Sequence, residues 1–408
     1  MALGIRSTAS LRLTLLFALL DAPACGRVGY AASTRDADVD LDALADGAAA
    51  HDGAAAAPLA FVAGAGHTCM VRGSGTLWCW GRSPNNGLGL GAPAAPSPTR
   101  VGTASTWRSL AAGLNHTIAL QEDRSLWGWG GNPAGQLGTG DVGTRWSPER
   151  IGTSLWDALS AGASRSCALD ADAALWCWGD NLRGSVGAGP TAPMDVRVPT
   201  RVLSTELFLR ADVGTQHTCA ISSTHALWCW GSNLNGQVGT PSVGNSIDVP
   251  ARVDMRTDWR ELFLGGDFSC GLPNDGTLWC WGANADGELG VGDNTAREVP
   301  TRVGTLATWR SGSAGTDYAC AIEERGSLWC WGANGSGQLG TGDLTAHASP
   351  VEIAPGQQWQ SVSAGDAHAC ALDVEGALWC WGNNSDGQLG VGDAVERLAP
   401  TLVPLPRE

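Results

Sequence analysis

The chain has 408 residues, which is enough for one large all-β domain or two ordinary domains. Its formal net charge of −15 argues against nucleic acid or an anionic membrane as a partner, because phosphate binding needs a dense basic surface. The 20 Trp and 57 Gly indicate one tryptophan-bearing motif that is copied many times.

The N-terminus has the three parts of a secretory signal peptide. Arg6 and Arg12 supply positive charge, residues 13–20 (LTLLFALL) form a short apolar core, and the small-residue site APA follows at 22–24. The apolar run is too short to span a bilayer. We therefore expect residues 1–24 to be removed and the protein to be secreted or held at the cell envelope.

Cys25 follows the predicted cleavage site directly, in an arrangement that resembles a bacterial lipoprotein signal. The resemblance implies a lipid on Cys25, which would be the only contact of the protein with a membrane. Ala22 stands where such signals usually have leucine, and APA also suits an ordinary signal peptidase site. The lipidated and the unmodified N-terminus therefore both stay open.

Residues 25–57 are rich in alanine and aspartate and have no sustained apolar periodicity. Such a segment buries too little apolar surface to offset its ordering entropy, so we expect a flexible tether. The alternating aspartates at 36–42 weakly resemble a calcium loop, although Leu41 stands where that loop needs glycine.

From residue 58 onward the chain consists of seven similar units, numbered here as repeats one to seven. Each contains a Trp-x-Trp motif, and the second tryptophans follow one another at spacings of 49 to 52 residues. They are Trp80, Trp129, Trp178, Trp230, Trp281, Trp331 and Trp381. A period near 50 is typical of propellers and solenoids.

Each unit has four apolar runs of four to six residues, bounded by Gly, Asn, Asp and Pro, and no segment long enough for a helix. Four short strands in each of seven units predict an all-β, seven-bladed β-propeller over residues 58–408. We expect the tryptophans to pack between blades, because neighbouring blades cover both faces of each sheet.

The recurring motifs G-x-x-H-T-C-A-L and L-W-C-W-G-x-N-x-x-G-Q-L-G-x-G-D resemble the repeat of the regulator of chromosome condensation family. The resemblance covers residues 58–408 and implies a seven-bladed propeller that is closed by pairing strands from the two chain ends. In this chain PTLV (400–403) would complete the blade that begins at LAFVAG (59–64).

Twelve of the 13 cysteines form pairs with nine residues between their members, spanning the turn of a predicted hairpin. The pairs are Cys69–Cys79, Cys167–Cys177, Cys219–Cys229, Cys270–Cys280, Cys320–Cys330 and Cys370–Cys380. Repeat two lacks both, with Ile118 and Gly128 in their places. Joint loss favours six disulfides over buried free thiols, and the spacing does not suit zinc. Cys25 is left over.

The residue two before the first cysteine position of each repeat forms a column of mostly histidines, which we expect to be structural. Its members are His67, His116, Arg165, His217, Phe268, Tyr318 and His368. Arg165, Phe268 and Tyr318 break the pattern, and Asp267 and Asp317 precede the two aromatic residues. If this turn lies on a propeller rim, these five residues are candidate contacts for a protein partner; simple sequence drift is the alternative.

No catalytic motif or unusual pair of carboxylates stands apart from the repeats, so we expect no catalysis, metal or cofactor. The glycine loops ending in aspartate are explained by turn chemistry. The prediction is an exported, lipid-anchored, monomeric propeller that binds a protein. Alternatives are a carbohydrate-binding surface protein and an enzyme, hydrolase or lyase, with a site in the axial channel. Nucleotide exchange and chromatin binding, known in the nuclear family member, are opposed by export, acidity and disulfides.

Overall fold

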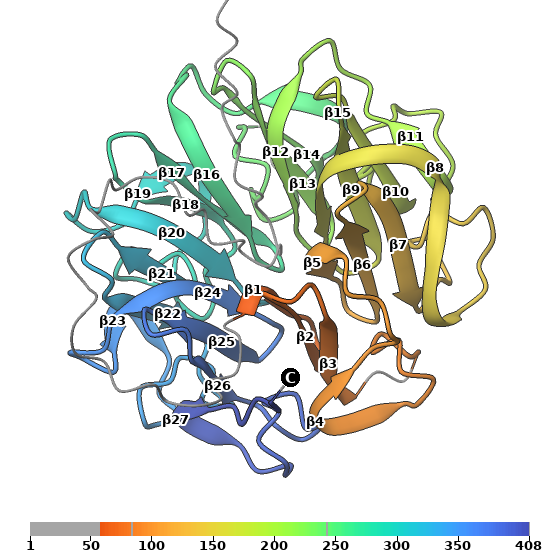
Figure 1. Cartoon of the computed structure of the whole chain (residues 1–408). Helices are drawn as coiled ribbons and strands as arrows, with labels where there is room; N and C mark the ends of the chain where they lie inside the picture. Colours follow the sequence, from red (N-terminus) through yellow and green to blue (C-terminus); the bar gives the residue numbers. More distant parts are fainter. Residues whose placement is uncertain (1–57, 83–84, 242–243, 408) are drawn as a thin grey trace, which may run out of the picture.

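The computed structural model describes residues 58–82, 85–241 and 244–407. The predicted signal peptide, the tether and Cys25 lie outside these residues. Every regular element of the described part is a β-strand, and the sheets are arranged around a common centre (Figure 1). No helix in it is long and apolar enough to cross a membrane.

The 27 strands form six antiparallel sheets in chain order. The first sheet contains β1 (Pro58–Ala63), β2 (His67–Arg72), β3 (Leu77–Arg82) and β4 (Ala94–Arg100). The second contains β5 (Trp107–Ala112), β6 (His116–Gln121), β7 (Ser125–Gly130), β8 (Arg145–Ala161), β9 (Arg165–Asp170), β10 (Leu175–Asp180) and β11 (Asp195–Arg201).

The other four sheets have four strands each and correspond to repeats four to seven. They contain β12 (Phe208–Val213), β13 (His217–Ser222), β14 (Leu227–Ser232) and β15 (Ser246–Arg252); β16 (Trp259–Leu264), β17 (Phe268–Pro273), β18 (Trp279–Gly282) and β19 (Arg297–Arg302); β20 (Trp309–Ala314), β21 (Tyr318–Glu323), β22 (Leu328–Gly332) and β23 (His347–Ile353); and β24 (Trp359–Ala364), β25 (His368–Asp373), β26 (Leu378–Gly382) and β27 (Arg397–Leu402).

Repeats two and three share one seven-stranded sheet because β8 serves both. Its first part pairs with β7 and its last part, from Trp156, pairs with β9. Four residues separate Ile151 from Trp156, whereas five separate the equivalent positions of the other repeats. The shorter connection leaves no room for a turn, so the outer strand of repeat two continues directly into the inner strand of repeat three.

The predicted closure by pairing of the two chain ends is wrong. The C-terminal strand β27 pairs with β26 of its own repeat, in the register Cys380 to Thr401, and β1 pairs with β2. The Pro-x-x-Val segment is thus the outer strand of its own sheet. The last repeat contacts the first without pairing of strands: the backbone N–H of Ala63 donates to Ser363 Oγ at 3.0 Å, and that of Asp366 donates to the carbonyl of Gly64 at 3.2 Å.

The second tryptophan of each Trp-x-Trp motif packs against the preceding repeat, as the sequence predicts. All seven are fully buried, and each indole Nε1 donates to a backbone carbonyl of that repeat's glycine loop. Examples are Trp129 with Gly87 at 2.8 Å and, across the chain ends, Trp80 with Gln388 at 2.9 Å. This contact joins neighbouring repeats at the same place around the ring.

The six predicted cysteine pairs are disulfides in the structure, each between directly opposed residues of two neighbouring strands. In repeat two, Ile118 opposes Gly128 in the same register. A Cβ atom at Gly128 would meet the side chains of Ile151, Leu137 and Ile118. Aliphatic side chains therefore occupy the volume that a disulfide occupies elsewhere.

Candidate functional site

The histidine column begins the second strand of each repeat and lies buried between repeats. Each of the four rings places Nε2 close to a hydroxyl of the next repeat, at 2.9 to 3.0 Å. The pairs are His67–Thr117, His116–Ser166, His217–Ser269 and His368–Thr68. Each of these hydroxyls in turn donates to a backbone carbonyl. The histidines are therefore structural, as expected.

Phe268 and Tyr318 occupy the same buried column and are not exposed contacts. Both are 0 % exposed. The next repeats carry Ala319 and Ala369 where a histidine would meet a hydroxyl, and Tyr318 Oη instead donates to the carbonyl of His368 at 2.6 Å. The prediction that they anchor a partner is wrong, because their rings fill the volume between repeats.

Arg165 is also fully buried and also joins two repeats. Its Nη2 lies 3.2 Å from the carbonyl oxygens of Gly214 and Thr215 and 3.3 Å from that of His217. Burial lowers its pKa to about 10. Arg165 is thus a structural cation held by backbone carbonyls, and its predicted role in a partner surface is also wrong.

The sequence contains a signal that the histidines, Phe268 and Tyr318 contact the next repeat. It becomes visible only when residues of neighbouring repeats are compared. When the column residue is His67, His116 or His217, the next repeat has Thr or Ser directly after its own column residue; after Phe268 and Tyr318 it has alanine. Arg165 does not follow this pattern, because the next repeat has Thr218 there. Comparing each column residue with the following repeat would have identified a contact between repeats.

Asp267 and Asp317 lie on the turn between the first and second strands, beside a glycine loop of the preceding repeat. Asp267 is half-buried and accepts hydrogen bonds from Asn235 Nδ2 at 3.3 Å and Gln237 Nε2 at 3.0 Å. Asp317 is exposed. Of the five predicted contact residues, Asp317 alone has an exposed side chain, so the structure does not bring the five together as a surface.

Glu288 stands next to Asp317 where four other repeats have glutamine. Its side chain is 2 % exposed, and its Oε2 accepts from the backbone N–H of Asp286 at 2.8 Å. Burial raises the pKa of Glu288, and the charges of Asp317 and Asp286 add to the increase. Desolvation by the surrounding loops raises the pKa of Asp317 even though its side chain reaches the surface, and the charges of Asp286 and Asp366 raise it further. This carboxylate pair is therefore destabilising when ionised.

Replacing Glu288 by glutamine should stabilise the protein at pH 7 by about 1 kcal/mol, because the amide can donate to Asp317 as Gln237 donates to Asp267. A raised carboxyl pKa means that the native protein gains stability as the pH falls toward the unfolded value. The advantage of the variant should therefore shrink as the pH falls toward 4.5. Urea unfolding at both pH values measures this.

The matched control is Gln237→Glu, which places a carboxylate beside Asp267 and should lower the free energy of unfolding at pH 7. Equal stability of Glu288→Gln and the parent protein at pH 7 would contradict the assignment.

The aspartates that end the glycine loops stabilise turns, as the sequence predicts. Four asparagines donate from Nδ2 to the carbonyls of these aspartates, and the aspartate Oδ1 atoms accept backbone N–H groups two residues later. The aspartates are Asp141, Asp293, Asp343 and Asp393. A hydrogen bond from Arg145 lowers the pKa of Asp141 to about 2.

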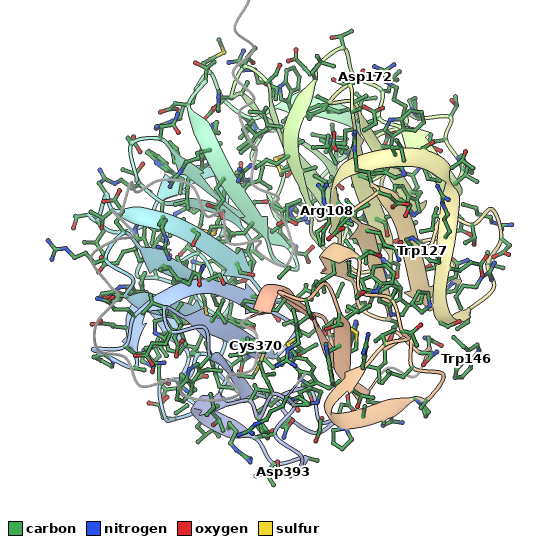
Figure 2. The ribbon with its side chains drawn as sticks, in the orientation of Figure 1. Arg108, Trp127, Trp146, Asp172, Cys370 and Asp393 are labelled. Atoms are coloured by element: carbon green, nitrogen blue, oxygen red, sulfur yellow. A yellow bond between two sulfur atoms is a disulfide. The ribbon has the colours of Figure 1, made fainter. Side chains whose placement is uncertain are left out.

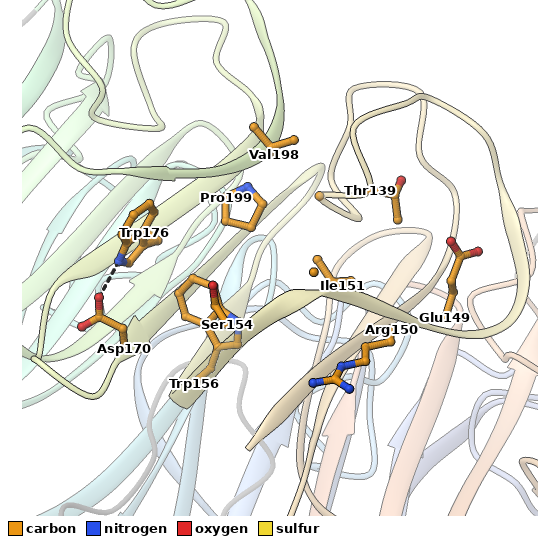
Figure 3. Close-up of a pocket in the computed structure, with 12 residues that line it drawn as sticks. Thr139, Glu149, Arg150, Ile151, Ser154, Trp156, Asp170, Trp176, Val198 and Pro199 are labelled. Atoms are coloured by element: carbon orange, nitrogen blue, oxygen red, sulfur yellow. Dashed lines mark hydrogen bonds between the residues drawn. The ribbon is translucent and has the colours of Figure 1, made fainter. Parts of the chain in front are cut away.

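A cavity of about 410 Å³ lies beside β8, between repeats two and three (Figure 3). Trp176 and Asp170 are at one end, and the Trp176 Nε1 donates to Asp170 Oδ2 at 2.7 Å. Glu149 and Arg150 are at the other end, and Ser154 lies between. The volume is in the range of small-ligand sites. Sequence analysis did not find this site, because its residues come from two repeats.

In the residue ranges that the structure describes, no group of three or more His, Cys, Asp and Glu side chains is placed to hold a metal ion.

Comparison with known proteins shows that family models of one kind match most of the chain. The model of the RCC1-like domain matches residues 24–358, and models of the regulator of chromosome condensation (RCC1) repeat match 359–388 and 375–408. The mitochondrial RCC1 domain-containing protein RUG3 of Arabidopsis thaliana is 38% identical over 85 residues, 19% of each chain. The ultraviolet-B receptor UVR8 of the same plant is 30% identical over 99 residues, 23% of this chain and 22% of the receptor. The chain thus spans about a fifth of the length of these relatives.

Two solved structures show the same fold. Human WBSCR16 has a TM-score of 0.74 at 21% identity, covering 81% of this chain and 94% of the other. Yeast RCC1 (Prp20), solved bound to Kap60, has a TM-score of 0.73 at 19% identity, covering 98% and 91%.

Proposed function

Because the chain belongs to the RCC1-like domain family, we propose that it is a non-catalytic, seven-bladed propeller that binds a protein partner. Counting β8 once in repeat two and once in repeat three supports seven blades of four strands. Yeast RCC1, which shares the fold, binds another protein, Kap60. The predicted contact residues do not support a surface at the histidine column, so the partner surface is assigned elsewhere.

The uneven distribution of exposed apolar side chains carries this proposal. Among the described residues, 8 of 16 exposed large apolar side chains lie in residues 142–207. They are Val142, Trp146, Leu155, Leu182, Met194, Val198, Leu203 and Leu207. Trp146 is 53% exposed and lies at the periphery (Figure 2). Concentrated apolar exposure favours protein binding, so we assign the partner surface to repeats two and three.

Export and lipid anchoring at Cys25 are part of the proposal. Six disulfides favour an oxidising compartment, such as the cell envelope or the medium. We further propose that the mature protein is a monomer and that a lipid would supply its only membrane contact, because the net charge of −15 opposes contact with anionic lipids.

The test is capture of a partner from cell-envelope fractions, followed by binding measurements with the purified partner. The variant Met194→Glu with Val198→Glu should weaken binding at least tenfold, since it places two charges in the apolar surface. The matched control is Val299→Glu with Leu306→Glu. Val299 occupies in repeat five the position of Val198 in repeat three, with similar exposure (46% against 51%).

Equal weakening by both double variants would contradict the assigned surface. Failure of any captured protein to bind saturably after purification would contradict the proposed function.

A further inference from the structure

The cavity between repeats two and three lies where repeat five places an arginine side chain. In repeat five the connection to the inner strand is one residue longer and carries Arg256 as its third residue after Val253. Ser154 is the third residue after Ile151 in repeat three. Its short side chain leaves the space beside Trp176 open (Figure 3).

The contacts of Arg256 show which groups surround a guanidinium in repeat five. Its guanidinium carbon lies 5.5 Å from the ring centroids of both Trp259 and Trp279, the equivalents of Trp156 and Trp176. Its Nη2 also contacts Asp258 at 2.9 Å and Asp275 at 3.0 Å. Repeat five therefore encloses a cation between two indole rings and two carboxylates.

Two other repeats bring a nitrogen donor near the same tryptophan from different sequence positions: Arg72 is the counterpart of Asp170, and Gln357 is the fourth residue after Ile353. In repeat one, the guanidinium carbon of Arg72 lies 5.4 Å from the centroid of Trp78. In repeat seven, Asp373 Oδ2 accepts both Trp379 Nε1 at 2.8 Å and Gln357 Nε2 at 3.5 Å. Asp170 is the equivalent of Asp373.

Repeat three has an acceptor, Asp170, and two tryptophans, Trp156 and Trp176, but it has the short Ser154 where repeat five has Arg256. Asp170 Oδ2 accepts Trp176 Nε1, and a carboxylate oxygen can accept a second hydrogen bond, as Asp373 does. Of the two carboxylates in the lining, Glu149 is already paired with Arg145 at 2.5 Å. Asp170 is therefore the carboxylate that favours a cationic ligand.

We propose that this cavity binds the guanidinium group of an arginine side chain, with Trp176 against its face and Asp170 as acceptor. A planar guanidinium both stacks on aromatic rings and donates to carboxylates, which an ammonium group does less well. That the arginine belongs to the protein partner rests on the proposed function; the guanidinium site itself does not. Val198, in the exposed apolar set, also lines the cavity.

The first experiment is a calorimetric titration of the purified protein with N-acetyl-L-arginine methylamide. We expect saturable binding at one site, and at least tenfold weaker binding of the citrulline analogue, which has the same shape without the charge. Ser154→Arg should abolish binding, because its own guanidinium would fill the cavity as Arg256 does in repeat five. Thr205→Arg is the matched control: it adds the same charge at the equivalent position of repeat four, which begins with Phe208 instead of tryptophan.

Arg256→Ser is the converse variant and should raise the number of sites from one to two. It keeps the test decisive if Ser154→Arg does not fold, which thermal unfolding will show. Absence of saturable binding, equal binding of the arginine and citrulline compounds, or unchanged binding to Ser154→Arg overturns the proposal.

The source of the arginine is decided with the captured partner. Weaker partner binding by Ser154→Arg, but not by Thr205→Arg, supports an arginine of the partner. If a partner binds both variants equally, that assignment fails while the proposed function stands. If the arginine compound binds but no protein partner is found, the proposed function fails and free arginine becomes the ligand.

Discussion

Lowering the pH from about 6.5 to about 4 should destabilise the protein by about 3 kcal/mol for each of two buried histidines. Burial lowers the pKa of His67 from 6.5 to about 4. Burial, and secondarily Arg165, lowers the pKa of His217 from 6.5 to about 3. In the native protein the His217 ring stays neutral over this range and the His67 ring binds a proton only near pH 4, whereas the unfolded chain binds protons below 6.5. The stability is complete above pH 6.5 and is lost as the pH falls.

The measurement is urea unfolding over a series of pH values. His67→Gln should reduce the pH dependence between 6.5 and 4 by nearly one proton, because glutamine does not titrate. The control is His225→Asn, at an exposed histidine whose φ of +59° asparagine also tolerates. Comparing the two variants separates the loss of a buried ring from the replacement of a histidine at the surface. The same slope for His67→Gln and the parent protein would contradict the burial of a neutral imidazole.

Removing one disulfide should lower the free energy of unfolding by about 2–3 kcal/mol, the loop-closure contribution expected for a ten-residue separation. The test variant is Cys320→Ala with Cys330→Ala, measured by urea unfolding without reductant. Six such losses together would be comparable with the whole stability of an ordinary domain. We therefore expect full reduction to unfold the propeller at physiological temperature.

Peptide mapping under non-reducing conditions checks the covalent state directly. The parent protein should show six links within hairpins, and the double variant should show five. Repeat two serves as an internal control, because its hairpin has Ile118 and Gly128 in place of the cysteines. Finding twelve free thiols in the mature protein would contradict both the bridges and the oxidising compartment.

Much of the fold could be predicted from local patterns that recur. The all-β class, the four strands of each unit and the packing of the second tryptophan follow from motifs copied seven times. The cysteine spacing places each pair directly opposite within a hairpin, which is a local geometry. The prediction that strands from the two chain ends pair was wrong because strand pairing between units is not a local property. A repeating sequence does not show which unit an outer strand joins, and Thr401 pairs with Cys380 of its own repeat.

The candidate site was less predictable, because a residue that departs from a repeated pattern can reflect either packing against the next repeat or binding of a partner. Phe268 and Tyr318 differ from the histidine column because the next repeat has alanine in place of the hydroxyl, and Arg165 donates to backbone carbonyls of the next repeat, so the exceptions reflect packing rather than binding. The cavity was missed for the reverse reason. It lies where repeat three has Ser154 and repeat five has Arg256, beside a connection one residue shorter than in the other repeats.

The sequence by itself determined what is local: the strands, the turns, the cysteine pairs and the acidic character of the chain. Their physical causes act within about ten residues, through side-chain alternation, glycine and aspartate turns and cross-strand pairing. Only the tertiary structure decided which residues of different repeats meet. Burial between repeats makes Phe268 and Tyr318 structural, and an unfilled volume beside Trp176 makes repeat three the candidate binding site.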